Sequence, residues 1–475
     1  MVLKVCMFVH NDFRHDSRVL KEAKTLAEAG HDVRVIAVLD NVTEPYEERD
    51  GFRVVRVVKD PVHYRLLRAV KESHLVIFPR FIGKLIVQVL RPPFRRILKT
   101  LLTYFARAKY GQTKSKSKLQ IYRRIVDRVC QVFRGIGQSM EQRLRVLLMV
   151  FHRALSFWDY YRRSFRLVIK ERADIYHAND LNTLPVAYWA KKKTGGKLIY
   201  DSHELYLERN TERKQSKVAK LLLSRLEYFL VRSVDDVITV SESIGQELKR
   251  RYPIKRLSVI LNTPCSQASG RTLSLRDELR IPKDNKIILY VGNITFNRGL
   301  EELIQSVSYL DDCVVVIMGR APKPAYNLVL RRLAREAGVE SKVYYFGPVP
   351  AEDVTEYAAF AHVGAASIKD VCLSYYYCLP NKLFEYMAAG LPVAGSNFPE
   401  LKKVIEGYNI GKTFNPDDPK DIAEAINYVL SDKQRYMQMK RNALRAARVF
   451  SWENESKKLL KIYKRLEDEL NITPN

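Results

Sequence analysis

A lysine and a glutamate stand one helical turn apart in a block near the end of this sequence. The block covers residues 379–393 and reads LPNKLFEYMAAGLPV. A proline followed by Asn381 is typical of a helix start, and Gly390 is typical of a helix end. Lys382 and Glu385 then point to the same side of that helix. A lysine for phosphate and a glutamate for ribose hydroxyls would span a nucleotide diphosphate; an intrahelical ion pair is the alternative.

A second polar loop supplies another cation. An apolar run over residues 286–291 is followed by Gly292, then by a loop through Asn297 and Arg298 to Gly299, where a helical pattern begins. A glycine-bounded loop at a helix start, with a cation beside it, can hold a diphosphate. A solvated turn arginine is the alternative.

Alternating strands and helices must position these loops. Strand patterns at 2–9, 32–38, 52–58, 173–177, 197–200 and 236–240 alternate with helical ones, and a second series starts at residue 286. Such units build parallel sheets, whose ligands bind at the carboxyl ends of the strands. We expect an α/β protein with two Rossmann-like lobes facing across a cleft. The predicted domains are an N-terminal lobe over 1–262, a C-terminal lobe over 285–450 and a helical tail over 451–475.

The positive charge is concentrated in one segment. The 475 residues carry a formal net charge of +28, and residues 61–172 hold 26 Lys and Arg against 5 Asp and Glu. Apolar residues recur at helical spacing among these cations over 94–105 and 146–157. Such helices suit an anionic membrane surface, and their apolar faces are too rich for nucleic acid. We expect a basic helical insertion in the first lobe that contacts a membrane; a packed subdomain with a solvated basic face is the alternative.

Composition and missing motifs exclude several classes. A hydrophobic content of 47% argues against a disordered chain, and six cysteines without a CxxC pair argue against a disulfide scaffold or a zinc site. Neither a dinucleotide-binding glycine motif nor a P-loop is present. No apolar run of about 20 residues and no secretory signal is visible. We expect a cytoplasmic protein, peripheral on the inner face of the cell membrane.

Taken in order, these motifs resemble glycosyltransferase family 4, whose members have the GT-B architecture. The resemblance covers residues 1–58 and 173–470, and the block at 380–393 is its most specific part. Its other motifs are Val9–Asn11 with Asp16–Val19, Gly30–Val33, His177–Asp180, Tyr200–Leu205, Val240 and Ser241, Tyr290–Gly292 with Arg298 and Gly299, Gly319, and Phe346 with Gly347.

The resemblance implies transfer of a sugar from a nucleotide-sugar with retention at the anomeric carbon. The nucleotide would bind the C-terminal lobe and the acceptor the N-terminal lobe. Arg298 and Lys382 match the family's diphosphate cations, Glu385 its ribose-binding acid, and His203 a residue near the reaction centre. The catalytic candidates are therefore His203, Arg298 and Lys382, and the candidates for substrate binding are Gly292, Asn297, Asn381, Glu385, Asp180 and Tyr377. The scheme requires no metal and no cofactor besides the donor substrate.

Structural roles remain open for several of these residues. His203 is alternatively a satisfied core histidine, and Asp180 a helix N-cap before Leu181. Asp16 and Arg18 are expected to form a salt pair at the start of the first helix.

Two departures from the family pattern bear on the donor. Many members have two glutamates separated by seven residues, but Tyr377 stands eight positions before Glu385 and the first acid is missing. The family arginine two residues after the Gly292-type strand end is also absent, because Asn293 and Ile294 follow Gly292. Recognition of the donor sugar is therefore open, and Arg298 and Lys382 remain as the phosphate pair.

The sequence favours a hexosyltransferase of cell-envelope polysaccharide biosynthesis, acting on a lipid-linked or polysaccharide-assembly acceptor at the membrane face. Two alternatives remain. One is a non-catalytic membrane or nucleic-acid adaptor on a GT-B scaffold, which Tyr377 in place of an acid keeps open. The other is a nucleotide-sugar epimerase of GT-B shape.

Overall fold

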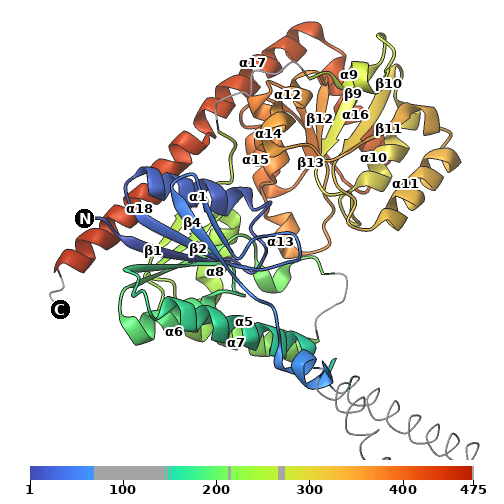
Figure 1. Ribbon diagram of the computed structural model, residues 1–475. Coiled ribbons are helices and arrows are strands. Elements are labelled where there is room, and N and C mark those ends of the chain that lie inside the picture. Colours follow the sequence, from blue (N-terminus) through green and yellow to red (C-terminus); the bar gives the residue numbers. More distant parts are fainter. Residues whose placement is uncertain (69–144, 146–147, 150, 212–215, 266–272, 473–475) are drawn as a thin grey trace, which may run out of the picture. The chain divides into compact units, whose positions relative to one another are not determined.

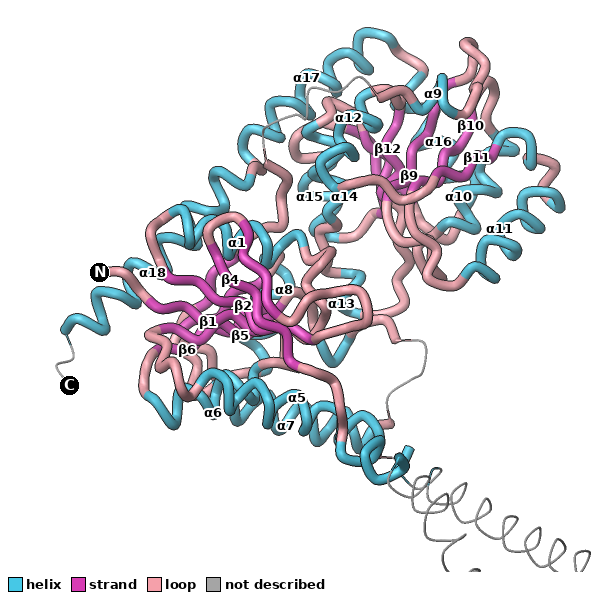
Figure 2. The backbone as a smooth tube through the Cα atoms, in the orientation of Figure 1, coloured by secondary structure: helices cyan, strands magenta, loops and turns pink. Residues whose placement is uncertain are grey.

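Two separate sheets, parallel except for one edge strand, organise the chain, as the computed structural model shows (Figure 1, Figure 2). It describes residues 1–68, 145, 148–149, 151–211, 216–265 and 273–472. The predicted two-lobed α/β architecture is confirmed. The chain divides into two compact units, Met1–Arg56 with Ser164–Asn475, and Val57–Arg163. Among the described helices, none combines the length and the hydropathy that a bilayer crossing requires.

The first sheet has eight strands. They are β1 (Lys4–Phe8), β2 (Asp32–Val38), β3 (Tyr46–Arg49), β4 (Phe52–Val57), β5 (Ile175–Asn179), β6 (Lys197–Ser202), β7 (Asp236–Thr239) and β8 (Leu257–Val259), in the order β3-β4-β2-β1-β5-β6-β7-β8. Strand β1 pairs in parallel with both β2 and β5, so the strand order reverses beside β1. The antiparallel edge strand β3 was not expected from the sequence, since Tyr46–Arg49 lacks a buried apolar face.

Helices lie on both faces of this sheet (Figure 1). They are α1 (Ser17–Glu28), α6 (Leu184–Thr194), η1 (Tyr206–Glu208), α7 (Lys217–Val231), α8 (Glu242–Arg251) and α18 (Trp452–Ile472). Helix α5 (His152–Val168) begins in the unit Val57–Arg163 and ends in the other unit. The C-terminal helix α18 packs in one buried cluster with α1 and β1, through Trp452, Leu459 and Tyr463. The indole of Trp452 donates to the hydroxyl of Thr25 at 3.0 Å. The predicted tail is therefore part of the first lobe's core.

The second sheet has six strands in the order β11-β10-β9-β12-β13-β14. They are β9 (Lys286–Val291), β10 (Cys313–Met318), β11 (Val343–Phe346), β12 (Val363–Ala366), β13 (Val393–Ser396) and β14 (Gly411–Phe414). Its helices are α9 (Leu275–Glu278), α10 (Leu300–Ser306), η2 (Val307–Tyr309), α11 (Pro324–Glu336), η3 (Glu340–Lys342), η4 (Ala351–Asp353), α12 (Val354–Ala359), α13 (Leu373–Tyr376), α14 (Asn381–Ala388), α15 (Pro399–Ile405), α16 (Pro419–Leu430) and α17 (Lys433–Val449).

Both sheets place their loops as an open parallel sheet should. Strand β9 pairs with β10 on one side and with β12 on the other, so the strand order reverses there too. In open α/β sheets, ligands bind beside such a reversal, at the carboxyl ends of the strands. The loops in question follow β1, β5 and β6 in the first sheet and β9 in the second.

The basic segment is described only in part. The predicted helix over 94–105 lies outside the described residues, and the one over 146–157 is described in part, where α5 begins at His152. In the unit Val57–Arg163, Nε2 of His63 lies 2.8 Å from Nδ1 of His152, and the backbone N–H of Asp60 donates to Asp159 at 3.1 Å.

A buried tyrosine joins helix α14 to strand β9. The hydroxyl of Tyr386 donates to the carbonyl of Leu289 at 2.9 Å and accepts from the N–H of Val291 at 3.0 Å. Its ring lies against Gly364 of β12, where any side chain would collide with it. The side chain of Tyr386 therefore fixes the position of α14 along β9.

We expect Tyr386→Phe to lower the free energy of unfolding by about 1–3 kcal/mol, because it leaves a buried carbonyl and a buried N–H of β9 without their partner. Urea unfolding measures the change. Tyr408→Phe, which removes an exposed hydroxyl, is the control and should alter stability by less than about 0.5 kcal/mol. Equal stabilities for the two variants would contradict this role of Tyr386.

Candidate active site

Arg298 and Lys382 bring two positive charges into one region of the second lobe. Arg298 precedes α10 on the loop after β9, and Lys382 lies in the first turn of α14. Among the described residues, neither Nε of Arg298 nor Nζ of Lys382 has a hydrogen-bond partner, although both atoms are buried. Burial, and then the nearby charge of Arg298, lower the pKa of Lys382 well below its usual value. The two predicted cations therefore share one region, and Nε of Arg298 and Nζ of Lys382 make no hydrogen bond to a described residue.

Aromatic rings hold both cations in place. Nζ of Lys382 lies 3.4 Å from the centre of the Tyr290 ring, and the guanidinium of Arg298 lies 4.6 Å from that of Tyr375. A ring face attracts a cation without neutralising it. These contacts fix two side chains that remain free to bind an anion.

Glycines let the backbone approach Lys382 and start α10. A Cβ on Gly292 would stand 3.9 Å from Nζ of Lys382, and the φ of Gly292 is +133°. Gly299 has a φ of +67°, and a side chain there would collide with Ser367. Either glycine replaced by a larger residue would strain the loop that carries Arg298.

Glu385 lies one turn after Lys382 and is half-buried. Burial raises the pKa of its carboxyl to about 7, although the charges of Lys382 and Lys21 act in the opposite direction. No contact between Glu385 and Lys382 closer than 4.0 Å occurs in the described structure, so the intrahelical ion pair is not formed. Glu385 is therefore available to accept hydrogen bonds from a ligand.

Asn297 and Tyr377, two other predicted binding residues of the second lobe, make contacts with the first lobe. Asn297 has a φ of +67°, and its amide donates to Asn210 at 3.4 Å. The carbonyl of Tyr377 accepts from the hydroxyl of Ser241 at 2.7 Å, while its ring packs on Tyr376. Tyr377 thus contributes its backbone to a contact, and the structure gives its ring no polar role.

His203 follows β6 and lies between two carboxylates. Its Nε2 is 3.3 Å from Oδ2 of Asp201 and 3.2 Å from Oδ1 of Asn179, and its Nδ1 is 3.7 Å from Oδ2 of Asp180. Burial disfavours the imidazolium, but the charges of Asp180 and Asp201 outweigh it and raise the pKa of His203 to about 10. His203 is therefore a cation at neutral pH.

Asp180 positions His203 and does not cap a helix. It has a φ of +64°, and its Oδ1 accepts from the backbone N–H of His203 at 3.1 Å. Helix α6 begins only at Leu184, after Thr183. The alternative of an N-cap before Leu181 was wrong, because the carboxylate of Asp180, at the end of β5, binds the residue after the neighbouring strand β6.

The expected Asp16–Arg18 salt pair was also wrong. Arg18 is buried and binds Asp201 with two hydrogen bonds, of 2.8 and 3.0 Å, and its Nε lies 3.2 Å from Glu22. Asp16 instead caps α1 by accepting from the N–H of Val19 at 3.3 Å. Its other oxygen accepts from the amide of Asn11 at 2.8 Å. A carboxylate from a distant strand competes successfully for Arg18 because both groups are buried there.

Glu22, His177 and Asp201 form a compact buried trio with the spacing of metal ligands. The guanidinium of Arg18 already forms ion pairs with two of these residues, Glu22 and Asp201, at the place where a metal ion would have to bind them. Burial raises the pKa of Glu22 to about 8 and lowers that of His177 to about 4, so both are largely neutral at pH 7. The trio therefore fits a structural support for Asp201 and His203.

A cavity of about 410 Å³ opens beside His203. Its lining includes the loop after β1 and the start of α1, together with the chain that leads into α14. The lining residues are Asn11, Asp12, His15, Asp16, Ser17, Arg18, His203, Val240, Asn262, Cys378, Leu379 and Asn381. Cys378 also lies within the field of Arg298 and Lys382, which lower the pKa of its thiol against the larger effect of burial. The cavity therefore borders the region of the cation pair.

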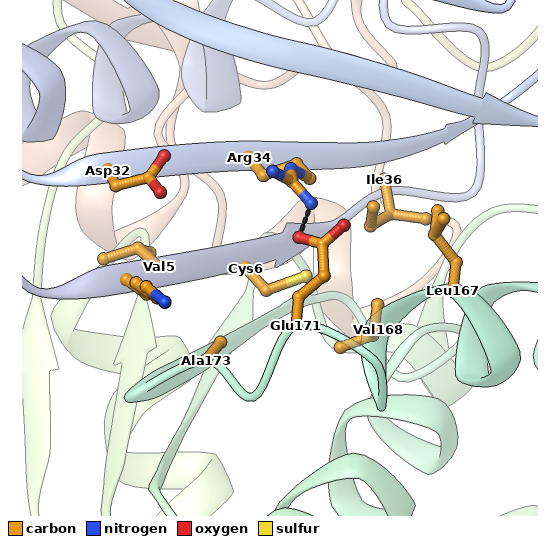
Figure 3. Close-up of a pocket in the computed structure, with 10 residues that line it drawn as sticks. Val5, Cys6, Asp32, Arg34, Ile36, Leu167, Val168, Glu171 and Ala173 are labelled. Atoms are coloured by element: carbon orange, nitrogen blue, oxygen red, sulfur yellow. Dashed lines mark ion pairs between the residues drawn. The ribbon is translucent and has the colours of Figure 1, made fainter.

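Another cavity, of about 20 Å³, lies at the first lobe's sheet, where Arg34 of β2 pairs with Glu171 (Figure 3). A single water molecule needs at least about 10–15 Å³. Lys4 and Asp32, which line it, begin their strands, so it lies at the end of the sheet away from His203. It is too small for a substrate.

Sequence reasoning missed the residues that support the predicted ones. Tyr290 and Tyr375 hold the cations, and Asp201 and Asn179 hold His203. Asp201 stands two residues before His203, so the two side chains lie on the same side of an extended chain, a signal that was available. Tyr290 carried no such signal, because a tyrosine inside an apolar strand is typical of a core.

Two family models match separate parts of the chain. The model for the "Glycosyl transferases group 1" matches residues 272–446, and the model for "Glycosyltransferase Family 4" matches residues 128–263. The D-inositol 3-phosphate glycosyltransferase of Corynebacterium glutamicum is 26% identical over 284 residues, which cover 56% of this chain and 66% of that protein. The lipopolysaccharide 1,2-N-acetylglucosaminetransferase of Salmonella typhimurium is 23% identical over 54% of this chain and 69% of that protein.

Solved structures share the fold. Anabaena HepE in complex with UDP-glucose has a TM-score of 0.64 at 14% identity, with 98% of this chain and 100% of that chain covered. The first curated relatives are matched over 46–66% of their own length.

We expect Lys382→Met to raise the free energy of unfolding of the ligand-free protein at pH 7 by about 1 kcal/mol, because it removes an unpaired buried charge. A lysine with a lowered folded-state pKa binds its proton more weakly in the folded than in the unfolded protein. The gain should therefore shrink as the pH rises towards 10.5, the usual lysine value. Lys402→Met, at an exposed position of α15, is the control for urea unfolding; a destabilised Lys382→Met would contradict the analysis.

The charge of His203 has the opposite effect on stability to that of Lys382. Its raised pKa stabilises the folded protein fully below pH 6.5, and this contribution is lost as the pH rises to about 10. The free-energy cost of His203→Gln should fall over that range. His362, whose pKa burial lowers to about 4, is the matched control, since the effect of His362→Gln should change only below pH 6.5. A cost of His203→Gln that stays constant from pH 6 to about 10 would rule out the imidazolium.

Proposed function

The chain belongs to the family 4 glycosyltransferases of the GT-B fold, and we propose that it transfers a sugar, with retention, from a nucleotide diphosphate donor. The resemblance stated from the sequence is thereby confirmed at the level of the family. The observation that carries the proposal is a pair of neighbouring cations, the buried Lys382 and the half-buried Arg298. The buried atoms Nε of Arg298 and Nζ of Lys382 have no hydrogen-bond partner among the described residues. A fold retains unpaired buried charge at a cost in stability, and binding of an anion offsets that cost.

The departing diphosphate is the group that needs stabilisation. As the glycosidic bond to the phosphate breaks, negative charge grows on the leaving oxygen. Arg298 and Lys382, already oriented by Tyr375 and Tyr290, meet that charge without reorganising. Glu385 would accept hydrogen bonds from the ribose hydroxyls, which suits a half-buried carboxyl one turn further along α14.

His203 acts as a cation in this scheme. An imidazolium cannot accept the proton of the acceptor hydroxyl, so the leaving phosphate oxygen takes that proton as the new glycosidic bond forms on the same face. His203 would instead donate a hydrogen bond to the donor sugar. Asp180 and Asp201 are positioning residues, because they act through the charge and orientation of His203.

The cavity beside His203 fits the acceptor. Its carboxyl and amide groups, among them Asn11, Asp16 and Asn262, suit a saccharide hydroxyl. The basic composition of residues 61–172 supports an acceptor that is lipid-linked, or part of a growing cell-envelope polysaccharide, at the inner face of the membrane. The similarity to a lipopolysaccharide transferase agrees with that class of acceptor. No metal or cofactor enters the scheme.

UDP is the first donor nucleotide to test, because a structural neighbour binds UDP-glucose. We expect Lys382→Met and Arg298→Met each to weaken UDP binding about 10–100-fold, the usual worth of a charged hydrogen bond. Lys402→Met should bind UDP as the wild type does. Calorimetry in buffers of different ionisation enthalpy, carried out over a range of pH below 10.5, should also show proton uptake on binding, because the diphosphate raises the lowered pKa of Lys382. Unchanged affinity in both variants would refute the site.

The same purified protein separates transfer from epimerisation. Conversion of a nucleotide-sugar into its epimer without any acceptor would identify an epimerase. Release of UDP that requires a saccharide acceptor, with the sugar recovered on that acceptor, supports the transferase.

A further inference from the structure

Helix α7 turns its apolar side away from the protein. Six large apolar side chains on it are exposed, and they recur at spacings of three and four residues. They are Val218, Leu221, Leu222, Leu226, Tyr228 and Phe229. The surface that they form is called here the α7 face.

The inward side of α7 is already satisfied. Leu230 and Val231 are buried, and the buried carboxyl of Glu227 accepts from the hydroxyls of Tyr200 at 2.8 Å and of Tyr252 at 2.6 Å. A surface helix normally buries its apolar stripe and exposes its charges. In α7 the charged group is inside and the apolar groups are outside, so packing against the first lobe does not account for the α7 face.

Positive charge surrounds the α7 face. Lys217, Arg225 and Arg232 are exposed on or next to it. Glu227, buried on the other side, is the one carboxylate of α7. Helix α6 extends the surface, because Tyr188 meets Phe229 edge-on at 5.8 Å and Lys192 lies over the Tyr188 ring. Glu208 of η1 neutralises Lys220 of α7 at 2.7 Å, but the helix itself offers no exposed carboxylate beside Lys217, Arg225 and Arg232. Exposed apolar side chains with a basic rim are the composition of a helix that lies in an anionic lipid surface.

Charge argues against two other occupants. Residues 69–144, which lie outside the described structure, contain 17 Lys and Arg against 3 Asp and Glu. A second copy of the chain would bring the same basic rim against itself. Both would place like charges together in a desolvated contact, whereas anionic headgroups would neutralise the rim.

We propose that the α7 face docks on an anionic membrane surface, with Leu222 and Phe229 entering the headgroup boundary. The proposal rests on the proposed function, because it names the surface at which a lipid-linked acceptor would be met. Binding is driven jointly by apolar burial and by attraction of Lys217, Arg225 and Arg232 to the headgroups.

Flotation of the full chain with lipid vesicles tests this proposal. Wild-type protein should float with vesicles containing phosphatidylglycerol and bind vesicles of phosphatidylcholine alone about tenfold more weakly. Leu222→Glu should lower the partition coefficient on the anionic vesicles about tenfold. Leu328→Glu on α11 is the matched control, since Leu222 and Leu328 are 65% and 68% exposed, and it should bind like the wild type.

Three results would overturn the proposal. One is Leu222→Glu binding anionic vesicles as tightly as Leu328→Glu does. The second is equal binding of the wild type to both kinds of vesicle. The third is a change in oligomeric mass on Leu222→Glu in analytical ultracentrifugation, which would make the α7 face a contact between copies. UDP affinity is measured on the same variants, and it should equal that of the wild type. If the wild-type protein does not bind UDP, the proposed function is contradicted, whatever the flotation result.

Discussion

Two neighbouring positive charges are the constraint on which the second lobe depends, because Nε of Arg298 and Nζ of Lys382 lack a hydrogen-bond partner among the described residues. Arg298 and Lys382 repel each other, and the burial of Lys382 adds to the cost of holding its charge. Neighbouring residues offset part of that cost without neutralising the charge. The rings of Tyr375 and Tyr290 lie against Arg298 and Lys382, and Gly292 leaves room for Lys382 at the end of β9. Tyr386 then ties the helix of Lys382 to the strand before the Arg298 loop. The site thus keeps like charges close together, and the hydrogen bonds of Tyr386 hold α14 beside β9.

The first lobe treats its cation in the opposite way. His203 is flanked by Asp180 and Asp201, and beneath it Arg18 binds Asp201 while Glu22 and His177 are largely neutral. Charge there is balanced before any ligand arrives, and the balance keeps the imidazolium protonated over the neutral range. One half of the site therefore holds two positive charges close together, and the other half holds a protonated imidazole beside the cavity.

Much of this arrangement was predictable. The two series of strands and helices predicted the two sheets. Arg298, Lys382 and Glu385 were proposed as phosphate- and ribose-binding residues from their order and spacing, and the structure brings the charges of the three into one region. The predictions failed where partners come from distant strands. Arg18 binds Asp201 instead of Asp16, and Asp180 binds His203 instead of capping α6, because local spacing holds no information about which carboxyl ends meet.

The sequence by itself determined the fold class, the family and the identity of the charged groups, since hydrophobic period and motif order are local properties of the chain. Only the tertiary structure decided that the cations lack hydrogen-bond partners, that His203 is protonated and that the apolar side of α7 faces outwards. Each of these depends on burial and on the distance between residues far apart in sequence, and both are set only when the sheets assemble.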